Sequence, residues 1–314
     1  MNKKRKIQLI IRIVAVFAFC LVGALIGYIT ALSGKVTFSD EKKQYIDVEF
    51  EKDLIDNITS LYNDVIVLES DITIKDLKCI VNEEQQFIGE FNGKGHTVTV
   101  ENFSEPLFRS IGETGYVHDV EFVFKDIVLP ADIEFFGLLG FDNYGSIKDV
   151  SIKVEKLNYT TSKDIKFGTV VATNYGIIKN CVIDLNGQKS KDDYYDKLYI
   201  GGVAYYNYNL VEKIIVKLNL NNLVQILQGN KENVNNIAAF VTSELKDGRT
   251  VSCVAVYDSS KYKFKDITTT ALKTGNISIS DVITQEIFNK LGFNANRWEY
   301  FEDTNTISMR GGGE

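Results

Sequence analysis

Proline is nearly absent from this chain, with 2 in 314 residues. Proline has no backbone N–H and is excluded from the interior of sheets, so its scarcity suits a chain that donates backbone hydrogen bonds along most of its length. Apolar residues make up 45% and charged residues 25%, an ordinary globular balance that excludes wholesale disorder. At roughly 100–200 residues per domain, the length allows one large domain or two small ones.

Cysteine and histidine are also scarce, with 4 and 2 residues. Cys20 falls in an apolar run, which leaves Cys79, Cys181 and Cys253 as an odd set without a C-x-x-C pair. This excludes a disulfide framework and favours buried thiols that act as small hydrophobic groups. The two histidines do not recur at metal-ligand spacing, so we predict neither a metal site nor a cofactor.

Acidic residues are missing from the first 34 positions. The 35 basic residues include five in that stretch, so the remainder carries 30 basic and 42 acidic side chains, a net charge of −12. A protein with this net negative charge repels phosphate groups, so nucleic acid is not an expected partner.

Residues 13–34 contain no charged side chain and have about the 20-residue length that a membrane-spanning helix needs. The basic residues lie on its N-terminal side, which predicts an N-terminus inside the cell. We therefore expect residues 1–12 to form a short cytoplasmic tail, residues 13–34 a transmembrane signal anchor and residues 35–49 a linker. Cleavage near Ala31, which would give a secreted protein, is the alternative. The C-terminus shows no cell-wall sorting signal, so attachment to the wall by that route is not expected.

Three segments of the chain repeat one pattern. Each has an apolar patch with a glycine, then a turn that contains asparagine, then a run in which apolar and polar residues alternate. The glycine precedes the first residue of that run by 13 positions each time, from 137 to 150, from 168 to 181 and from 201 to 214. Alternation with period 2 is typical of strands, and a period near 31 residues without intervening helices predicts a solenoid of parallel strands.

The repeat defines two columns of side chains that point into the core. With weaker copies on either side, the first column contains Val120, Val150, Cys181, Ile214 and Cys253. The second lies two positions further along each strand and contains Phe122, Ile152, Ile183, Val216 and Ala255. Cys181 and Cys253 are then two strands apart, roughly 9–10 Å at the usual strand spacing. This exceeds the about 7 Å limit for a disulfide, so we predict that they are not bonded to each other.

The ends of such a solenoid carry unpaired strand edges that have to be covered. Residues 50–63 and 284–291 both have apolar residues at helical spacing, and we expect them to form short helical caps. Trp298 is predicted to pack at the second cap. The solenoid with its N-terminal cap is predicted to span residues 50–300, and residues 301–314 to form a C-terminal tail.

Several short motifs resemble one family of bacterial surface proteins. Residues 87–98 read FIGEFNGKGHTV, which is similar to the opening motif of GLUG-type β-helices, F-x-G-x-(F/L)-(D/N)-G-x-G-H-x-(I/V). Residues 137–140 match the Gly-Leu-any-Gly motif that gives the family its name, and residues 65–72 and 288–298 resemble its preceding strand and closing segment. The resemblance covers about residues 45–300. It implies a right-handed parallel β-helix on a secreted or surface-bound protein, often adhesin-like, and supplies no catalytic residue.

The turns of the repeat carry the first candidate binding residues. Asn143, Asn174 and Asn207 form one column, and a ladder of side-chain amides is its predicted role, with a ligand site as the alternative. The residues that follow these asparagines are Tyr144, Tyr175 and Tyr208. They are predicted to form an aromatic strip, which could bind sugars or only stabilise the solenoid.

An insertion at residues 188–199 is the second candidate. Loops that leave a rigid scaffold often carry binding residues, and this one combines acidic and aromatic side chains that could meet a glycan or calcium. Its candidate residues are Asp193, Tyr194, Tyr195 and Asp196. A solvated loop without a ligand is the favoured interpretation, and a binding loop is the alternative.

Catalytic motifs are missing from the sequence. It contains no His-Glu-x-x-His, no Gly-x-Ser-x-Gly and no paired carboxylates at the repeat spacing. We therefore predict a non-enzymatic binding or structural module outside a bacterial cell membrane, with a surface glycan or an envelope or host protein as its partner. The first alternative is an extracellular polysaccharide lyase or glycoside hydrolase, because such enzymes also use β-helices. The second is a subunit of a cell-envelope assembly.

Overall fold

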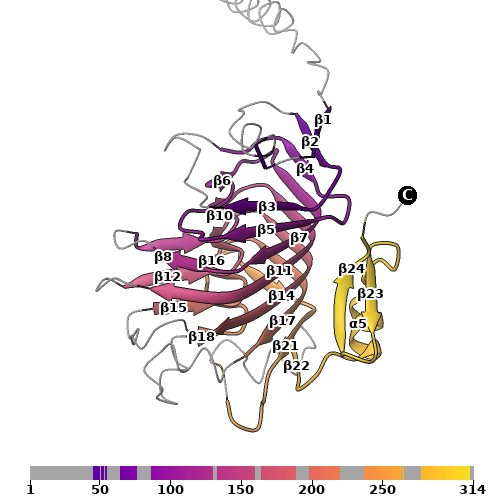
Figure 1. The fold of residues 1–314 in the computed structure, drawn as a ribbon. Helices are drawn as coiled ribbons and strands as arrows, with labels where there is room; N and C mark the ends of the chain where they lie inside the picture. The colour runs from indigo at the N-terminus through magenta and orange to yellow at the C-terminus, as the bar shows by residue number, and fades with distance from the viewer. Residues whose placement is uncertain are drawn as a thin grey trace, which may run out of the picture. The chain divides into compact units, whose positions relative to one another are not determined.

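The computed structural model shows an all-β fold built mainly of parallel strands (Figure 1). Its only helix that is described over its full length is α5 (Gln285–Leu291). The predicted all-β class with parallel sheets is therefore confirmed. The structure describes residues 45–49, 51–52, 54, 64–75, 86–129, 133–159, 164–188, 198–219, 237–262, 264 and 277–311.

The largest sheet, sheet A, has 13 strands, and its main path consists of parallel neighbours. In order, this path is β1 (Tyr45–Val48), β2 (Val65–Leu68), β4 (Glu90–Asn92), β7 (Tyr116–Phe124), β11 (Ser146–Tyr159), β14 (Ile177–Gln188), β17 (Leu210–Leu218), β21 (Cys253–Val256) and β22 (Ile277–Ser280). The strands beside this path are β3 (Ile72–Lys75), β5 (Thr97–Glu101), β8 (Ile127–Leu129) and β20 (Arg249–Val251). Strand β1 falls in the predicted linker 35–49, where it pairs with β2.

Two smaller parallel sheets complete the repeat. Sheet B contains β6 (Ser110–Ile111), β10 (Gly140–Asn143), β13 (Val171–Asn174), β16 (Ala204–Asn207) and β19 (Val241–Glu244). Sheet D contains β9 (Phe135–Gly137), β12 (Ile165–Gly168), β15 (Leu198–Gly201) and β18 (Ile237–Ala238). Successive repeats place one strand in sheet D, the next in sheet B and the next in sheet A, as in β9-β10-β11, β12-β13-β14 and β15-β16-β17.

The strand register follows the sequence repeat. Gly168 pairs with Gly137 on one side and Gly201 on the other. A Cβ atom at Gly168 would lie 1.9 Å from the carbonyl oxygen of Val171, so the close approach of sheets D and B requires a glycine there. The glycine column of the sequence is thus a structural requirement of the bend.

Both predicted inward columns lie in one continuous apolar core. Val150 pairs with Val120, and Cys181 pairs with Ile214, as the repeat predicts. Cys181 and Cys253 are free thiols, which confirms the prediction that they are not bonded. Burial raises the pKa of both thiols, that of Cys253 to about 12, so they remain uncharged hydrophobic groups at neutral pH.

A column of left-handed residues, which the sequence analysis missed, precedes the first inward column in sheet A. Asp119, Asp149, Asn180, Lys213 and Ser252 all have φ between 51° and 56°. Asp and Asn tolerate this conformation because their short side chains bond to nearby backbone groups. Each strand therefore bends at the same point of the repeat.

The C-terminal segment, residues 281–311, packs on the outer face of sheet A. It consists of α5, capped by Thr284 and Gly292, and an antiparallel hairpin of β23 (Trp298–Phe301) and β24 (Thr306–Met309). Its apolar side chains form a second core with outward residues of sheet A, and these residues are Val182, Ile215, Val254 and Val256. The helix expected at 284–291 is present, but it covers a sheet face instead of capping an end, and the segment expected to be a tail contains β24.

Several sequence predictions fall outside the described residues. They are the cytoplasmic tail 1–12, the membrane segment 13–34, most of the N-terminal cap 50–63, Cys79, and the insertion residues Asp193, Tyr194, Tyr195 and Asp196. Among the residues that are described, no helix has the length and apolar character needed to cross a membrane.

Candidate functional site

A ladder of buried asparagines fixes the corner where sheet B ends. Asn143, Asn174 and Asn207 are the last residues of β10, β13 and β16, and all three are fully buried. The Nδ2 of Asn143 donates to Oδ1 of Asn174 at 2.8 Å, and Nδ2 of Asn174 donates to Oδ1 of Asn207 at 2.9 Å. The predicted amide ladder is therefore confirmed, and it sets the position of the residues that follow it.

Those residues are the three tyrosines of the predicted strip. The Tyr144 and Tyr175 ring centroids are 4.8 Å apart with planes 4° apart, and the Tyr175 and Tyr208 centroids are 4.6 Å apart with planes 18° apart. Tyr144 is 39% exposed and Tyr175 38% exposed. The ring spacing matches the strand spacing because the amide ladder holds each tyrosine in register. The result is a strip of stacked rings at the surface.

A groove of about 510 Å³ lies beside this strip, over the outer side of sheet B. Its walls are mostly aromatic and come from Phe135, Phe141, Tyr175, Tyr206 and Tyr208. Ligand sites in proteins commonly have volumes of about 300–1,000 Å³, with apolar walls and a few polar groups. The groove therefore has the size and lining of a small-ligand site.

The rings of the groove are held by contacts with one another. The Phe135 and Tyr206 ring centroids are 6.0 Å apart. The Tyr205 and Tyr206 rings are nearly perpendicular, with their centroids 4.7 Å apart. Lys166, which lies outside the groove lining, places its Nζ 4.5 Å from the Phe135 centroid and pairs with Glu134. Side chains that are already held in place lose less conformational entropy when a ligand binds than flexible side chains do.

Asp142 and Thr173 are the polar residues of the groove. They pair in register on β10 and β13, and Thr173 pairs with Tyr206 of β16. Burial raises the pKa of the Asp142 carboxyl, while a hydrogen bond from Thr173 acts in the opposite direction. Within the described ranges, no lysine or arginine forms an ion pair with Asp142. The groove therefore contains a partly desolvated acid without a cationic partner in that part of the chain.

Known proteins give no further guide to this site. Comparisons with protein families, curated proteins and solved structures yield no match. The GLUG-type resemblance thus rests on the short motifs alone, and function has to be argued from the residues themselves.

The repeat in the sequence predicted the tyrosine strip but not the rest of the groove. Asp142, Thr173 and Tyr206 directly precede the three ladder asparagines, so the same repeat spacing could have identified them as one outward column. The residue type in this column differs from repeat to repeat, so a search for identical or similar residues at the repeat spacing does not find it. In the structure all three residues of this mixed column line the groove.

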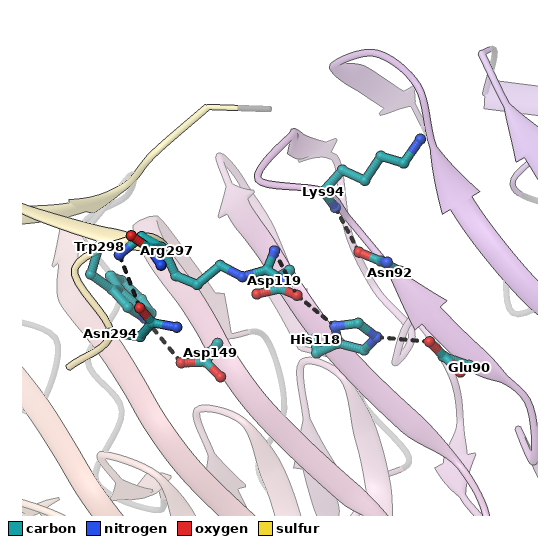
Figure 2. A network of polar contacts seen from close by, with 10 residues as sticks. Glu90, Asn92, Lys94, His118, Asp119, Asp149, Asn294, Arg297 and Trp298 are labelled. Atoms are coloured by element: carbon teal, nitrogen blue, oxygen red, sulfur yellow. Dashed lines mark hydrogen bonds and ion pairs between the residues drawn. The ribbon is translucent and has the colours of Figure 1, made fainter. Parts of the chain in front are cut away.

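A second polar cluster lies on the outer face of sheet A (Figure 2). His118 is held between two carboxylates, with Nδ1 2.7 Å from Oδ2 of Asp119 and Nε2 3.2 Å from Oε1 of Glu90. Arg297 of the C-terminal segment places Nη1 2.9 Å from the same Asp119 oxygen. Trp298 donates from Nε1 to Oδ1 of Asp149 at 3.1 Å.

These contacts give the second cluster a structural role. Asp119 and Asp149 are two of the left-handed residues of sheet A, and both bind the C-terminal segment. Burial, followed by the nearby carboxylates, raises the pKa of the adjacent Tyr116 to about 12. Within the described part of the chain, no three His, Cys, Asp or Glu side chains are grouped so that they could hold a metal ion. The ion pair of Asp119 with Arg297 and the hydrogen bond from Trp298 to Asp149 attach the C-terminal segment to sheet A.

Proposed function

We propose that this protein is a bacterial surface module that binds a glycan, without cleaving it, in the groove beside the tyrosine strip. The observation that carries the proposal is the stack of partly exposed rings, Tyr144, Tyr175 and Tyr208, which borders an aromatic groove of about 510 Å³. Sugars have a flat face of C–H groups that packs on aromatic rings, and hydroxyls at their edges that bond to polar side chains. Asp142 and Thr173 are placed to meet such hydroxyls.

We infer that the three sheets are the faces of a right-handed parallel β-helix of the GLUG type. Support comes from the rotation of successive strands through sheets D, B and A, and from the repeated register of the glycine and asparagine columns. A scaffold of this kind holds the groove rigidly, because every strand of sheet B is fixed by its neighbours.

In this proposal the β-helix stands outside a bacterial cell membrane, attached through residues 13–34. The length of that uncharged run and the basic residues before it support this location. The acidic charge of the remaining chain fits a module that stays in solution above an anionic membrane.

Replacing Tyr144, Tyr175 and Tyr208 together by alanine is expected to weaken glycan binding at least about tenfold, because the stacking platform is lost. The measurement is a glycan array followed by calorimetry on the purified full-length chain. The matched control replaces Tyr45, which is 70% exposed on β1 and does not line the groove, and its binding should equal that of the wild type.

The proposal fails if the folded wild-type chain binds no glycan, or if the triple variant binds as tightly as the wild type. The length of the bound oligosaccharide is also measured after prolonged incubation. An unchanged length supports binding without cleavage, whereas shortened products would favour a polysaccharide lyase or glycoside hydrolase.

A further inference from the structure

We propose that the glycan bound in this groove carries protonated amino groups, and that Asp142 recognises one of them. This inference rests on the proposed glycan binding and names the chemical class of the ligand. Asp142 is the one charged side chain among the described residues that line the groove, and its walls are otherwise mainly aromatic. One anion among aromatic faces is the arrangement that favours an ammonium group over a neutral ligand.

The state of Asp142 supports a cationic ligand. Burial raises the pKa of this carboxyl because its ionised form is poorly solvated, and a hydrogen bond from Thr173 acts in the opposite direction. A neutral hydroxyl could donate a hydrogen bond to the carboxylate, but it would leave the negative charge uncompensated. An ammonium group would both donate hydrogen bonds to the free lone pairs of the carboxylate and neutralise its charge.

The aromatic rings around Asp142 already accept an ammonium group from the protein itself. Lys166 holds its Nζ 4.5 Å from the centroid of Phe135, which is within the range of a cation–π contact. Tyr206, whose ring lies 6.0 Å from that of Phe135, continues the aromatic surface into the groove beside Asp142. The ring faces there are thus suited to a second cation.

The net charge of the chain after position 34 also favours a cationic ligand. Residues after position 34 carry a net charge of −12, which attracts a polycationic glycan and repels an anionic one. This long-range term affects the association rate, whereas Asp142 provides the specific contact.

The test compares two oligosaccharides of equal length, tetrameric β-1,4-glucosamine and its fully N-acetylated form, which differ in charge. Calorimetry uses the full-length chain at a pH at which the amines are protonated. We expect the amine form to bind at least about tenfold more tightly. Asp142→Asn, which keeps the shape and removes the charge, is expected to abolish this preference. Asp184→Asn, on sheet A and paired with Lys217, is the matched control and should retain it.

The outcomes separate this inference from the glycan-binding proposal. If both tetramers bind the wild type equally, or if Asp142→Asn keeps the preference, the inference is wrong and glycan binding stands. If neither tetramer nor any arrayed glycan binds, both proposals fall. If Asp142→Asn does not fold, as judged by circular dichroism, the affinities of the wild type and of the Thr173→Val variant for the two tetramers are compared instead. Equal affinities of the wild type for both tetramers would then show that the inference is wrong.

Discussion

Replacing Trp298 by alanine is expected to release the C-terminal segment from sheet A and to destabilise its docking by about 3–5 kcal/mol. The indole is fully buried and packs edge-on against Phe293 with centroids 5.2 Å apart. Its loss removes the largest buried side chain of the second core and also the hydrogen bond from Nε1 to Asp149. The Asp149 carboxylate also loses its hydrogen-bond donor, and its desolvation adds to the free-energy cost of the cavity.

The release is measured by hydrogen exchange in β14, β17 and β21, whose outward valines and isoleucine lie beneath the segment. Exchange is expected to rise there while the strands of sheets B and D, which contribute no residue to the second core, stay protected. The matched control is Phe301→Ala on the same strand, which is 44% exposed and should change stability by less than about 0.5 kcal/mol. Trp298 is also the chain's single tryptophan, so its emission reports on the segment in the wild type.

If the Trp298→Ala variant exchanges like the wild type, the segment is not held by this side chain. In the wild type, denaturant should shift the tryptophan emission before it changes the sheet signal in circular dichroism. Coincident transitions would instead show that the segment and the sheets unfold as one unit.

The inward columns could be predicted from sequence because burial repeats with the strand. Val150 and Ile152 are two positions apart and face the same core, and the pattern recurs in each repeat. The asparagine ladder could be predicted for a related reason. A side-chain amide has both a donor and an acceptor, so an Asn column can bond from repeat to repeat, each amide accepting from one neighbour and donating to the other.

The position of the C-terminal segment could not be predicted in this way. Helical spacing in residues 284–291 indicates an apolar face but not the surface that it covers. A signal was present in sheet A, where Val182, Ile215 and Val254 interrupt the alternation at outward positions. Uninterrupted apolar runs are typical of strands buried on both faces. The sequence thus contained both halves of this contact without any indication that they meet.

The groove depends on neighbours that are distant in sequence. Asp142 and Tyr206 lie in sheet B but come from different repeats, and Phe135 lies in sheet D. They line one groove because the strands stack in register. Composition instead drew attention to the insertion at 188–199 as a candidate, because acidic and aromatic residues are consecutive there. Local composition identifies such loops readily, whereas a site built across repeats requires the register to be known first.

Replacing Asn174 by alanine is expected to lower the free energy of unfolding by about 3 kcal/mol, because it removes the middle of the ladder. The Asn174 amide accepts from Asn143 and donates to Asn207 and to the carbonyl oxygens of Gly176 and Leu210. Its loss leaves several buried groups without a partner. Small domains are stable by about 5–15 kcal/mol in total, so the effect is large.

Chemical denaturation measures this loss, and Asn219→Ala is the matched control. Asn219 donates to Oδ1 of Asn186 at 2.8 Å, the same bond length as in the ladder, but at an exposed position. Water replaces that bond, so the control is expected to change stability by less than about 0.5 kcal/mol. Equal effects of the two substitutions would show that the ladder contributes no more than a surface amide pair.

Asn174→Asp tests the same ladder through pH. An ionised carboxylate at this position would face Oδ1 of Asn207 without a proton to donate, whereas the protonated acid could donate as the amide does. Burial would therefore raise the pKa of the introduced group above its value in the unfolded chain. The variant is expected to be most stable below the unfolded pKa and to lose stability as the pH rises through the raised folded pKa. A variant whose stability relative to the wild type does not change with pH would show that no proton is needed at this step of the ladder.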